Sequence, residues 1–208
     1  MKQLAIVIVN YKVPHFVAQC LDSVLQVTRN IDAEVWVVDN ASGDGSLEML
    51  SPQYPSVHFI GNSENVGFAR ANNQALRQVD AEYSLLLNPD TLIGESTLEE
   101  CLCFMQQHPE AGALGVRMMN AQGEFLAESK RGLVTPFVAF CKIAQLGRLF
   151  PKSAVFNRYY LGHLSKEEVQ EAPILSGAFF FARSEALQKV GYLDERYFMY
   201  GEDIDLSY

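Results

Sequence analysis

The first 110 residues alternate short aliphatic runs with segments of helical periodicity, and this alternation limits the fold more than any other feature. The aliphatic runs fit buried strands and lie at residues 4–9, 34–38, 57–60 and 83–87. Apolar residues at helical spacing follow at 14–25, 68–79 and 98–105. Strands that alternate with helices form a parallel sheet with crossover helices. The sequence therefore predicts an α/β fold.

The remainder of the chain is less regular. Residues 112–118 and 124–127 are expected to pair around a turn, residues 174–182 resemble a strand, and residues 184–190 predict a helix that ends at Gly191. Ser96 with Glu99 predicts a capping box at the start of an earlier helix.

Composition narrows the classes of function. The chain has 208 residues, 49% of them hydrophobic and 20% charged, which is typical of globular proteins and excludes a disordered one. A net charge of −9 disfavours nucleic-acid binding, because an acidic surface repels a phosphate backbone. No apolar run approaches the roughly 20 residues of a membrane span, and the N-terminus does not resemble a signal peptide. We therefore expect a cytoplasmic protein.

Polar residues follow each of the predicted parallel strands. They are Asn10 and Tyr11, Asp39 and Asn40, Asn65, and Asn88 with Asp90. In parallel sheets, ligands bind beyond the carboxyl ends of the strands. Asn and Asp are also common turn residues, which explains any one of these positions but explains the whole set less well.

Three of these segments carry chemistry suited to a phosphorylated ligand. The carboxylate of Asp39, at the end of a strand, can accept hydrogen bonds from a base or a ribose. The start of the helix that carries Arg70 favours an anion. Asp90 can bind Mg²⁺ together with substrate phosphates, which would let an acidic protein hold a diphosphate. The alternatives are a capped surface helix and an ordinary Asn-Pro-Asp turn. P-loop and dinucleotide-binding fingerprints are absent from the sequence.

The last candidate segment is an acidic cluster formed by Glu202, Asp203 and Asp205 among apolar neighbours. Like charges favour proton uptake by one carboxylate, so one of them could act as a general base. A solvated helix start is the alternative. Because this cluster lies so close to Tyr208, we expect the natural protein to continue past that residue.

Taken in order, these segments resemble the family 2 glycosyltransferases, and within them the bacterial rhamnosyltransferase-type enzymes of surface-polysaccharide assembly. The matching segments are VNYK, VVDNASGDGS, NVGFARANN, LLLNPD, GAFFFAR and FMYGEDIDL, which extend over nearly the whole chain. The resemblance implies a GT-A fold, Rossmann-like, with a mixed and mainly parallel sheet. It also implies a single catalytic domain over residues 1–208, with a nucleotide-binding half at 1–110 and an acceptor-side half at 111–208.

The resemblance assigns roles to individual residues. The metal, Mg²⁺ or Mn²⁺, would bind Asp90; Asp203 would be the catalytic base, with Glu202 beside it. Asn88 stands where the family often has Asp, and it can still bond a ribose hydroxyl. The nucleoside would contact Asn10, Tyr11, Asp39 and Asn40. The ribose and diphosphate would contact Asn65, Gly67, Arg70 and Asn72. The sugar and the acceptor would contact Ser176, Gly177, Ala178 and Asp205.

The implied activity is an inverting transfer from a nucleotide-diphosphate sugar, UDP- or dTDP-linked and including dTDP-rhamnose, to a hydroxyl of a saccharide or lipid-linked saccharide. Two alternatives remain: a sugar-phosphate nucleotidyltransferase and a non-catalytic nucleotide-sugar-binding module. The mixture of apolar and basic residues at 132–150 is typical of a helix packed on its own domain. Peripheral contact with the inner face of the plasma membrane is the alternative.

Overall fold

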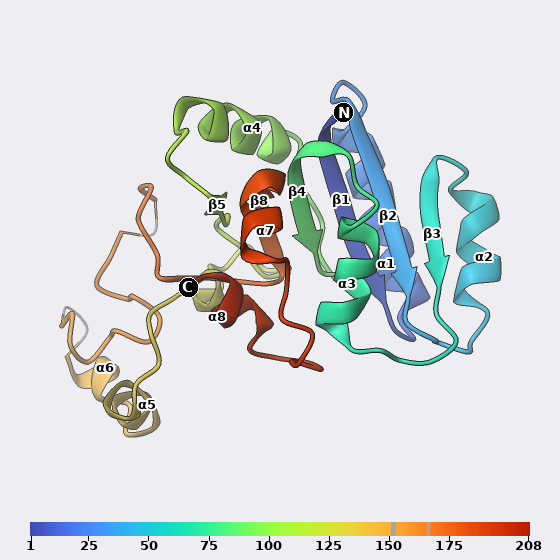
Figure 1. The fold of residues 1–208 in the computed structure, drawn as a ribbon. Helices are drawn as coiled ribbons and strands as arrows, with labels where there is room; N and C mark the ends of the chain where they lie inside the picture. The colour runs from blue at the N-terminus through green and yellow to red at the C-terminus, as the bar shows by residue number, and fades with distance from the viewer. Residues whose placement is uncertain (151–152, 166) are drawn as a thin grey trace. The chain divides into compact units, whose positions relative to one another are not determined.

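A computed structural model describes residues 1–150, 153–165 and 167–208. The chain forms two compact units (Figure 1). The first contains Met1–Leu114 and Gly177–Leu206, and the second contains Gly115–Ser176 with residues 207–208. Residues 177–206 thus belong with the N-terminal part of the chain, although they lie in the predicted acceptor-side half.

A mixed sheet forms the centre of the first unit. Its strand order is β3-β2-β1-β4-β8-β5, in which β1 to β4 are parallel and β8 is antiparallel to both of its neighbours. The predicted mixed and mainly parallel sheet is therefore confirmed. The strands are β1 (Lys2–Asn10), β2 (Ala33–Asp39), β3 (Val57–Gly61), β4 (Ala81–Leu87), β5 (Ala113–Leu114) and β8 (Phe179–Arg183).

Burial on both faces explains why β1 reads as one continuous aliphatic run. Every side chain from Leu4 to Asn10 is buried, because β1 lies between β2 and β4 and helices cover both faces of the sheet. Figure 1 shows α3 and α7 in front of the sheet and α1 behind it. The helices of this unit are α1 (Pro14–Val27), α2 (Ser46–Gln53), α3 (Phe68–Leu76), α4 (Thr97–Gln107), α7 (Ser184–Val190) and α8 (Glu202–Leu206).

Some local predictions were wrong. The strand expected at 174–182 is two strands, β7 (Ile174–Leu175) and β8, which belong to different sheets. The Ser96 hydroxyl does not cap α4 but donates to Glu100 Oε1 at 2.6 Å, so the predicted capping box is not formed. The turn near residue 121 is present and is closed by the bridge of Met119 with Phe125 and by the hydrogen bond from the Leu126 N–H to the Met118 carbonyl, but residues 113–114 pair with β8 instead.

The described residues of the second unit form little regular structure. Its small antiparallel sheet pairs β6 (Lys130–Arg131) with β7. The helices are η1 (Ala127–Ser129), α5 (Pro136–Ile143) and α6 (Leu146–Leu149). Among the described residues of either unit, no helix combines the length and apolar character that crossing a membrane requires.

Candidate functional site

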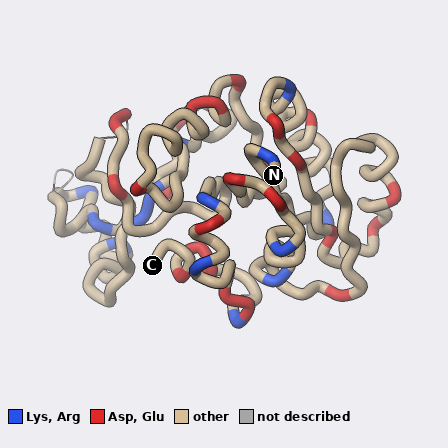
Figure 2. Tube along the Cα trace, turned by 45° about the horizontal axis from the view of Figure 1, so that its top comes forward, with Lys and Arg blue, Asp and Glu red and all other residues tan. Residues whose placement is uncertain are grey.

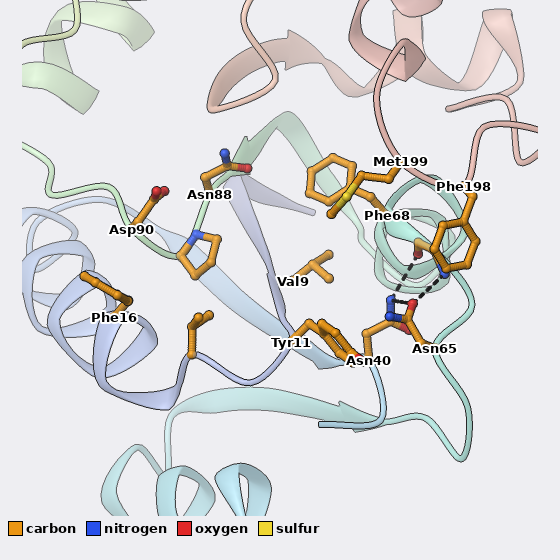
Figure 3. A pocket seen from close by; sticks show the side chains of 13 residues that line it. Val9, Tyr11, Phe16, Asn40, Asn65, Phe68, Asn88, Asp90, Phe198 and Met199 are labelled. Atoms are coloured by element: carbon orange, nitrogen blue, oxygen red, sulfur yellow. Dashed lines mark hydrogen bonds between the residues drawn. The ribbon is translucent and has the colours of Figure 1, made fainter. Parts of the chain in front are cut away.

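A pocket of about 580 Å³ opens at the carboxyl ends of β1, β2 and β4, within the first unit. This volume lies in the range of small-molecule sites. Figure 3 shows Asn88 and Asp90 on one side of the pocket and Asn40 and Asn65 on the other. The lining residues are Val9, Tyr11, Val13, Phe16, Asn40, Asn65, Gly67, Phe68, Asn88, Pro89, Asp90, Phe198 and Met199. The sequence-predicted residues that it brings together are Tyr11, Asn40, Asn65, Gly67, Asn88 and Asp90.

Asn40 holds the loop that follows β3 against the end of β2. Its Nδ2 donates to Asn65 Oδ1 at 2.8 Å and to the Gly67 carbonyl at 3.3 Å. Its Oδ1 accepts from Asn62 Nδ2 at 3.2 Å and from the Val66 backbone N–H at 3.0 Å. Both ends of this buried carboxamide are therefore used, and the side chain fixes the shape of the pocket wall.

Asp39 and Asn10 lie behind the pocket rather than on its lining. Asp39 Oδ1 accepts from Asn10 Nδ2 and from the Ser42 hydroxyl, each at 2.6 Å. The Ser42 hydroxyl in turn accepts from the Lys12 backbone N–H at 2.9 Å. This buried network fixes the turn that carries Tyr11 into the pocket, and the nucleoside contacts of Asp39 and Asn10 stay predictions.

Gly67 allows two distant segments to meet at the pocket. Its φ of +85° and ψ of 167° lie in a region that is essentially restricted to glycine. A Cβ at this position would lie 2.6 Å from the Phe198 carbonyl oxygen. The same oxygen accepts from the Phe68 N–H at 2.7 Å. The start of α3 and the segment before the acidic cluster are thereby joined, and both line the pocket.

Phe198 and Met199 form one wall of the pocket. From the sequence they were identified only as apolar neighbours of the acidic cluster. The segment that bears them is tied to α3 by Asn73, whose carboxamide donates to the Leu193 carbonyl at 2.8 Å and accepts from the Leu193 N–H at 3.1 Å. Asn73 is fully buried. It lies in the NVGFARANN segment, but no local pattern points to its partner Leu193, which is 120 positions away.

Arg70 and Asn72 lie outside the pocket lining. Arg70 Nε donates to Glu195 Oε2 at 3.2 Å, and Asn72 Nδ2 donates to the Phe68 carbonyl one turn earlier in α3. Glu195 also accepts from Asn73 and Arg77. The hydrogen bond from Asn73 and the charges of the two arginines lower the pKa of Glu195. The phosphate contacts of Arg70 and Asn72 stay predictions.

Asp90 is the one carboxylate among the residues that line the pocket. Among the described residues, its side chain makes no hydrogen bond or ion pair, and no group of three potential metal ligands is found. Burial, assisted by the charge of Asp90, raises the pKa of the Cys20 thiol to about 12. A single carboxylate facing a cavity fits Mg²⁺ or Mn²⁺ when substrate phosphates supply further ligands.

The acidic cluster lies on α8, outside the pocket lining. The Gly177 N–H donates to Asp203 Oδ2 at 3.2 Å. The neighbouring Ala178 carbonyl accepts from the Asn88 N–H at 3.0 Å. The backbone of residues 177–178 therefore links Asp203 directly to the Asn88 edge of the pocket. Glu202 and Asp205 share this short helix with Asp203, and Ser176 belongs to the second unit.

Comparisons with known proteins identify the family. The model of "Glycosyl transferase family 2" matches residues 5–191. An N-acetylglucosaminyl-diphospho-decaprenol L-rhamnosyltransferase of Mycobacterium tuberculosis is 30% identical over 83% of this chain, which spans 59% of that relative.

Solved glycosyltransferase structures share the fold. The 1–349 fragment of S. aureus TarS superposes with a TM-score of 0.68 at 19% identity. The match covers 99% of this chain and 54% of the TarS fragment. A mannosyltransferase of Pyrobaculum calidifontis, solved with GDP-Man and Mn²⁺, superposes with a TM-score of 0.66 at 18% identity, over 99% of this chain and 50% of its own. These matches agree with the predicted GT-A fold. On the strength of the family match, the chain belongs to glycosyl transferase family 2.

Proposed function

We propose that this chain transfers a sugar, with inversion, from a nucleotide-diphosphate donor to a hydroxyl acceptor in glycan synthesis. The observation that carries the proposal is the pocket at the strand ends, where Asp90 lies exposed and Asn88 connects through residues 177–178 to Asp203. The backbone of residues 177–178 bonds both Asp203, the proposed proton acceptor, and Asn88, beside the proposed donor-phosphate site. Holding the two sites in a fixed relation suits a direct displacement.

Asp203 is the proposed general base. The Gly177 N–H donates a hydrogen bond to one oxygen of its carboxylate, which orients the side chain. In the transfer step, the acceptor hydroxyl gives its proton to Asp203 while its oxygen forms a bond to the anomeric carbon. The bond between that carbon and the diphosphate oxygen breaks, and the nucleoside diphosphate leaves with the bonding electrons. Attack opposite the leaving group inverts the anomeric configuration.

The pocket is proposed to hold the donor through its aromatic and carboxamide groups. Tyr11 and Phe198 offer ring faces, and Asn65 and Asn88 offer hydrogen-bonding groups to the nucleoside and ribose. Asp90 would hold the divalent cation, which when bound neutralises charge on the leaving diphosphate. The remaining predicted roles, for Asn10, Asp39, Arg70 and Asn72 at the nucleotide and for Ser176, Ala178 and Asp205 at the acceptor, form part of the same proposal.

The names of the similar proteins support the classes of donor and acceptor. The mycobacterial relative is named for a decaprenol-linked acceptor and an L-rhamnosyl group. The TarS fragment was also solved with UDP-GlcNAc. We therefore propose a UDP- or dTDP-sugar donor and a saccharide or lipid-linked saccharide acceptor.

Donor turnover tests the proposal. The chain is incubated with radiolabelled UDP- and dTDP-sugars and Mn²⁺, and release of free sugar or transfer to an added acceptor is measured. Asp203→Asn is expected to slow either reaction by about 10²–10⁴-fold, because it removes a general base, and to leave donor binding unchanged. Glu185→Gln, which alters an exposed ion pair on α7, is the matched control and should keep the native rate.

The outcomes separate the alternatives. Near-native turnover by Asp203→Asn would remove this residue from the role of base. Donor binding without release or transfer of sugar would indicate a non-catalytic binding module. Formation of pyrophosphate from a nucleoside triphosphate and a sugar phosphate would indicate a nucleotidyltransferase.

A further inference from the structure

Helix α5 presents apolar side chains to the outside of the second unit. Val138 and Cys141 are its buried residues. Phe137, Phe140 and Ile143, which are spaced by three residues and share one face, are 53%, 59% and 80% exposed. An amphipathic helix usually directs such a face into the core. The predicted packing of this stretch on its own domain therefore accounts for only part of its apolar surface.

Further exposed apolar residues lie on and just after the neighbouring helix α6. The short helix α6 packs against α5, and Leu149 and Phe150 at its end are also exposed. We refer to Phe137, Phe140, Ile143, Leu149 and Phe150 as the α5–α6 surface. Several large exposed apolar residues on two packed helices are the kind of surface that a partner or a membrane covers.

The charge of the surrounding sequence differs from that of the rest of the chain. Between Ser129 and Ser165 there are six Lys and Arg residues and no Asp or Glu, in a chain whose net charge is −9. Elsewhere in the chain 25 acidic residues stand against 10 basic ones, and Figure 2 marks both kinds along the trace. Lys142 and Arg148, both exposed, lie on or beside the helices that bear the α5–α6 surface.

Lys142 brings a positive charge to the same helix, on a different side of α5 from Phe140 and Ile143, because successive helix residues point about 100° apart. Its ammonium group lies 3.5 Å from the centre of the Tyr159 ring and 4.8 Å from that of Tyr160. A helix that exposes an apolar face and carries a cation on another side is suited to the boundary between lipid headgroups and acyl chains.

We propose that the α5–α6 surface docks on a bilayer that contains anionic phospholipid. The apolar side chains would enter the boundary of the acyl chains, and the basic residues would meet the phosphate groups. A protein partner could cover the apolar residues, but it would give no reason for 37 residues without a carboxylate. This inference goes beyond the proposed function, because docking on lipid requires no donor, acceptor or sugar transfer.

Vesicle cosedimentation of the whole chain tests the proposal. We expect binding to phosphatidylcholine vesicles that contain phosphatidylglycerol, weaker binding at high salt, and little binding to phosphatidylcholine alone. The double variant Phe140→Gln with Ile143→Gln should lower the partition coefficient at least about tenfold, because two large apolar side chains no longer leave water. Val190→Gln, which changes a comparably exposed residue of α7, should bind as the native chain does.

Charge reversal provides an independent readout. Lys142→Glu with Arg148→Glu should abolish the preference for anionic vesicles, whereas Arg29→Glu on the exposed surface of the first unit should keep it. The proposal is overturned if the native chain ignores anionic vesicles or if the Gln double variant binds them as strongly. It is also overturned if sedimentation shows self-association through this surface in place of lipid binding. Sugar-transfer activity does not enter any of these readouts.

Discussion

Replacing Gly67 with alanine should disturb both the stability of the chain and its pocket. The backbone conformation at Gly67, with φ +85°, costs about 1–3 kcal/mol for a residue with a Cβ. The added Cβ would also meet the Phe198 carbonyl oxygen at 2.6 Å and the Phe198 ring at 2.9 Å. Relief of this clash breaks the hydrogen bond from Phe68 to Phe198, which contributes about 0.5–1.5 kcal/mol. The expected loss in the free energy of unfolding is therefore about 2–4 kcal/mol.

Two measurements distinguish the ways in which the chain can respond. Urea denaturation reports the loss of unfolding free energy if the segment 193–199 stays docked on α3. If that segment detaches, Phe198 and Met199 leave the pocket, and calorimetry should then show weaker binding of UDP or dTDP.

Gly191→Ala is the matched control, because Gly191 has φ +86° and no atom within 4 Å of the added Cβ. It should cost about 1 kcal/mol through backbone strain alone and leave nucleotide affinity unchanged. The reasoning is refuted if Gly67→Ala keeps both native stability and native affinity.

Further substitutions test the contacts that support the pocket. Glu195→Gln should destabilise the chain by about 1–2 kcal/mol at pH 7, whereas Glu185→Gln on the surface should leave its stability unchanged. Folding lowers the pKa of Glu195. Its contribution to the free energy of unfolding is therefore present above the carboxyl pKa of the unfolded chain and is lost as the pH falls through the pKa of the folded chain. Denaturation at acidic pH should then show a smaller difference between Glu195→Gln and the native chain. Asn73→Ala leaves both backbone groups of Leu193 without their partners, and denaturation should show a loss of about 2–4 kcal/mol. Asp39→Asn turns an acceptor of the buried network into a donor and should cost about 1–3 kcal/mol by the same assay, whereas no change would mean that the network rearranges freely.

The strands of the parallel sheet could be predicted from sequence because each satisfies a local rule. The segment 4–9 is aliphatic throughout because helices cover both faces of β1, and the polar residues that follow the strands meet at one edge because the strands are parallel. Asn40, Asn88 and Asp90 could therefore be assigned to one pocket without coordinates.

The return of residues 177–206 to the first unit could not be predicted in this way. Strand β8 pairs antiparallel with β4, which is about a hundred residues earlier in the chain, and no local periodicity encodes such a pairing. The two-point clamp of Asn73 on Leu193 is equally non-local, so Asn73 was missed although its segment was recognised. Arg70 was assigned to a phosphate because the sequence near it shows no carboxylate partner. In the structure its partner is Glu195, which lies 125 positions away.

Calorimetric titration of UDP or dTDP, with and without Mn²⁺, tests whether Asp90 holds a divalent cation at the donor site. We expect Mn²⁺ to strengthen binding to the native chain at least about tenfold. Asp90→Asn should remove this gain, and Glu95→Gln, at an exposed acid outside the pocket, should keep it. Equal affinity with and without metal in the native chain, or an undiminished gain in Asp90→Asn, would contradict this role of Asp90.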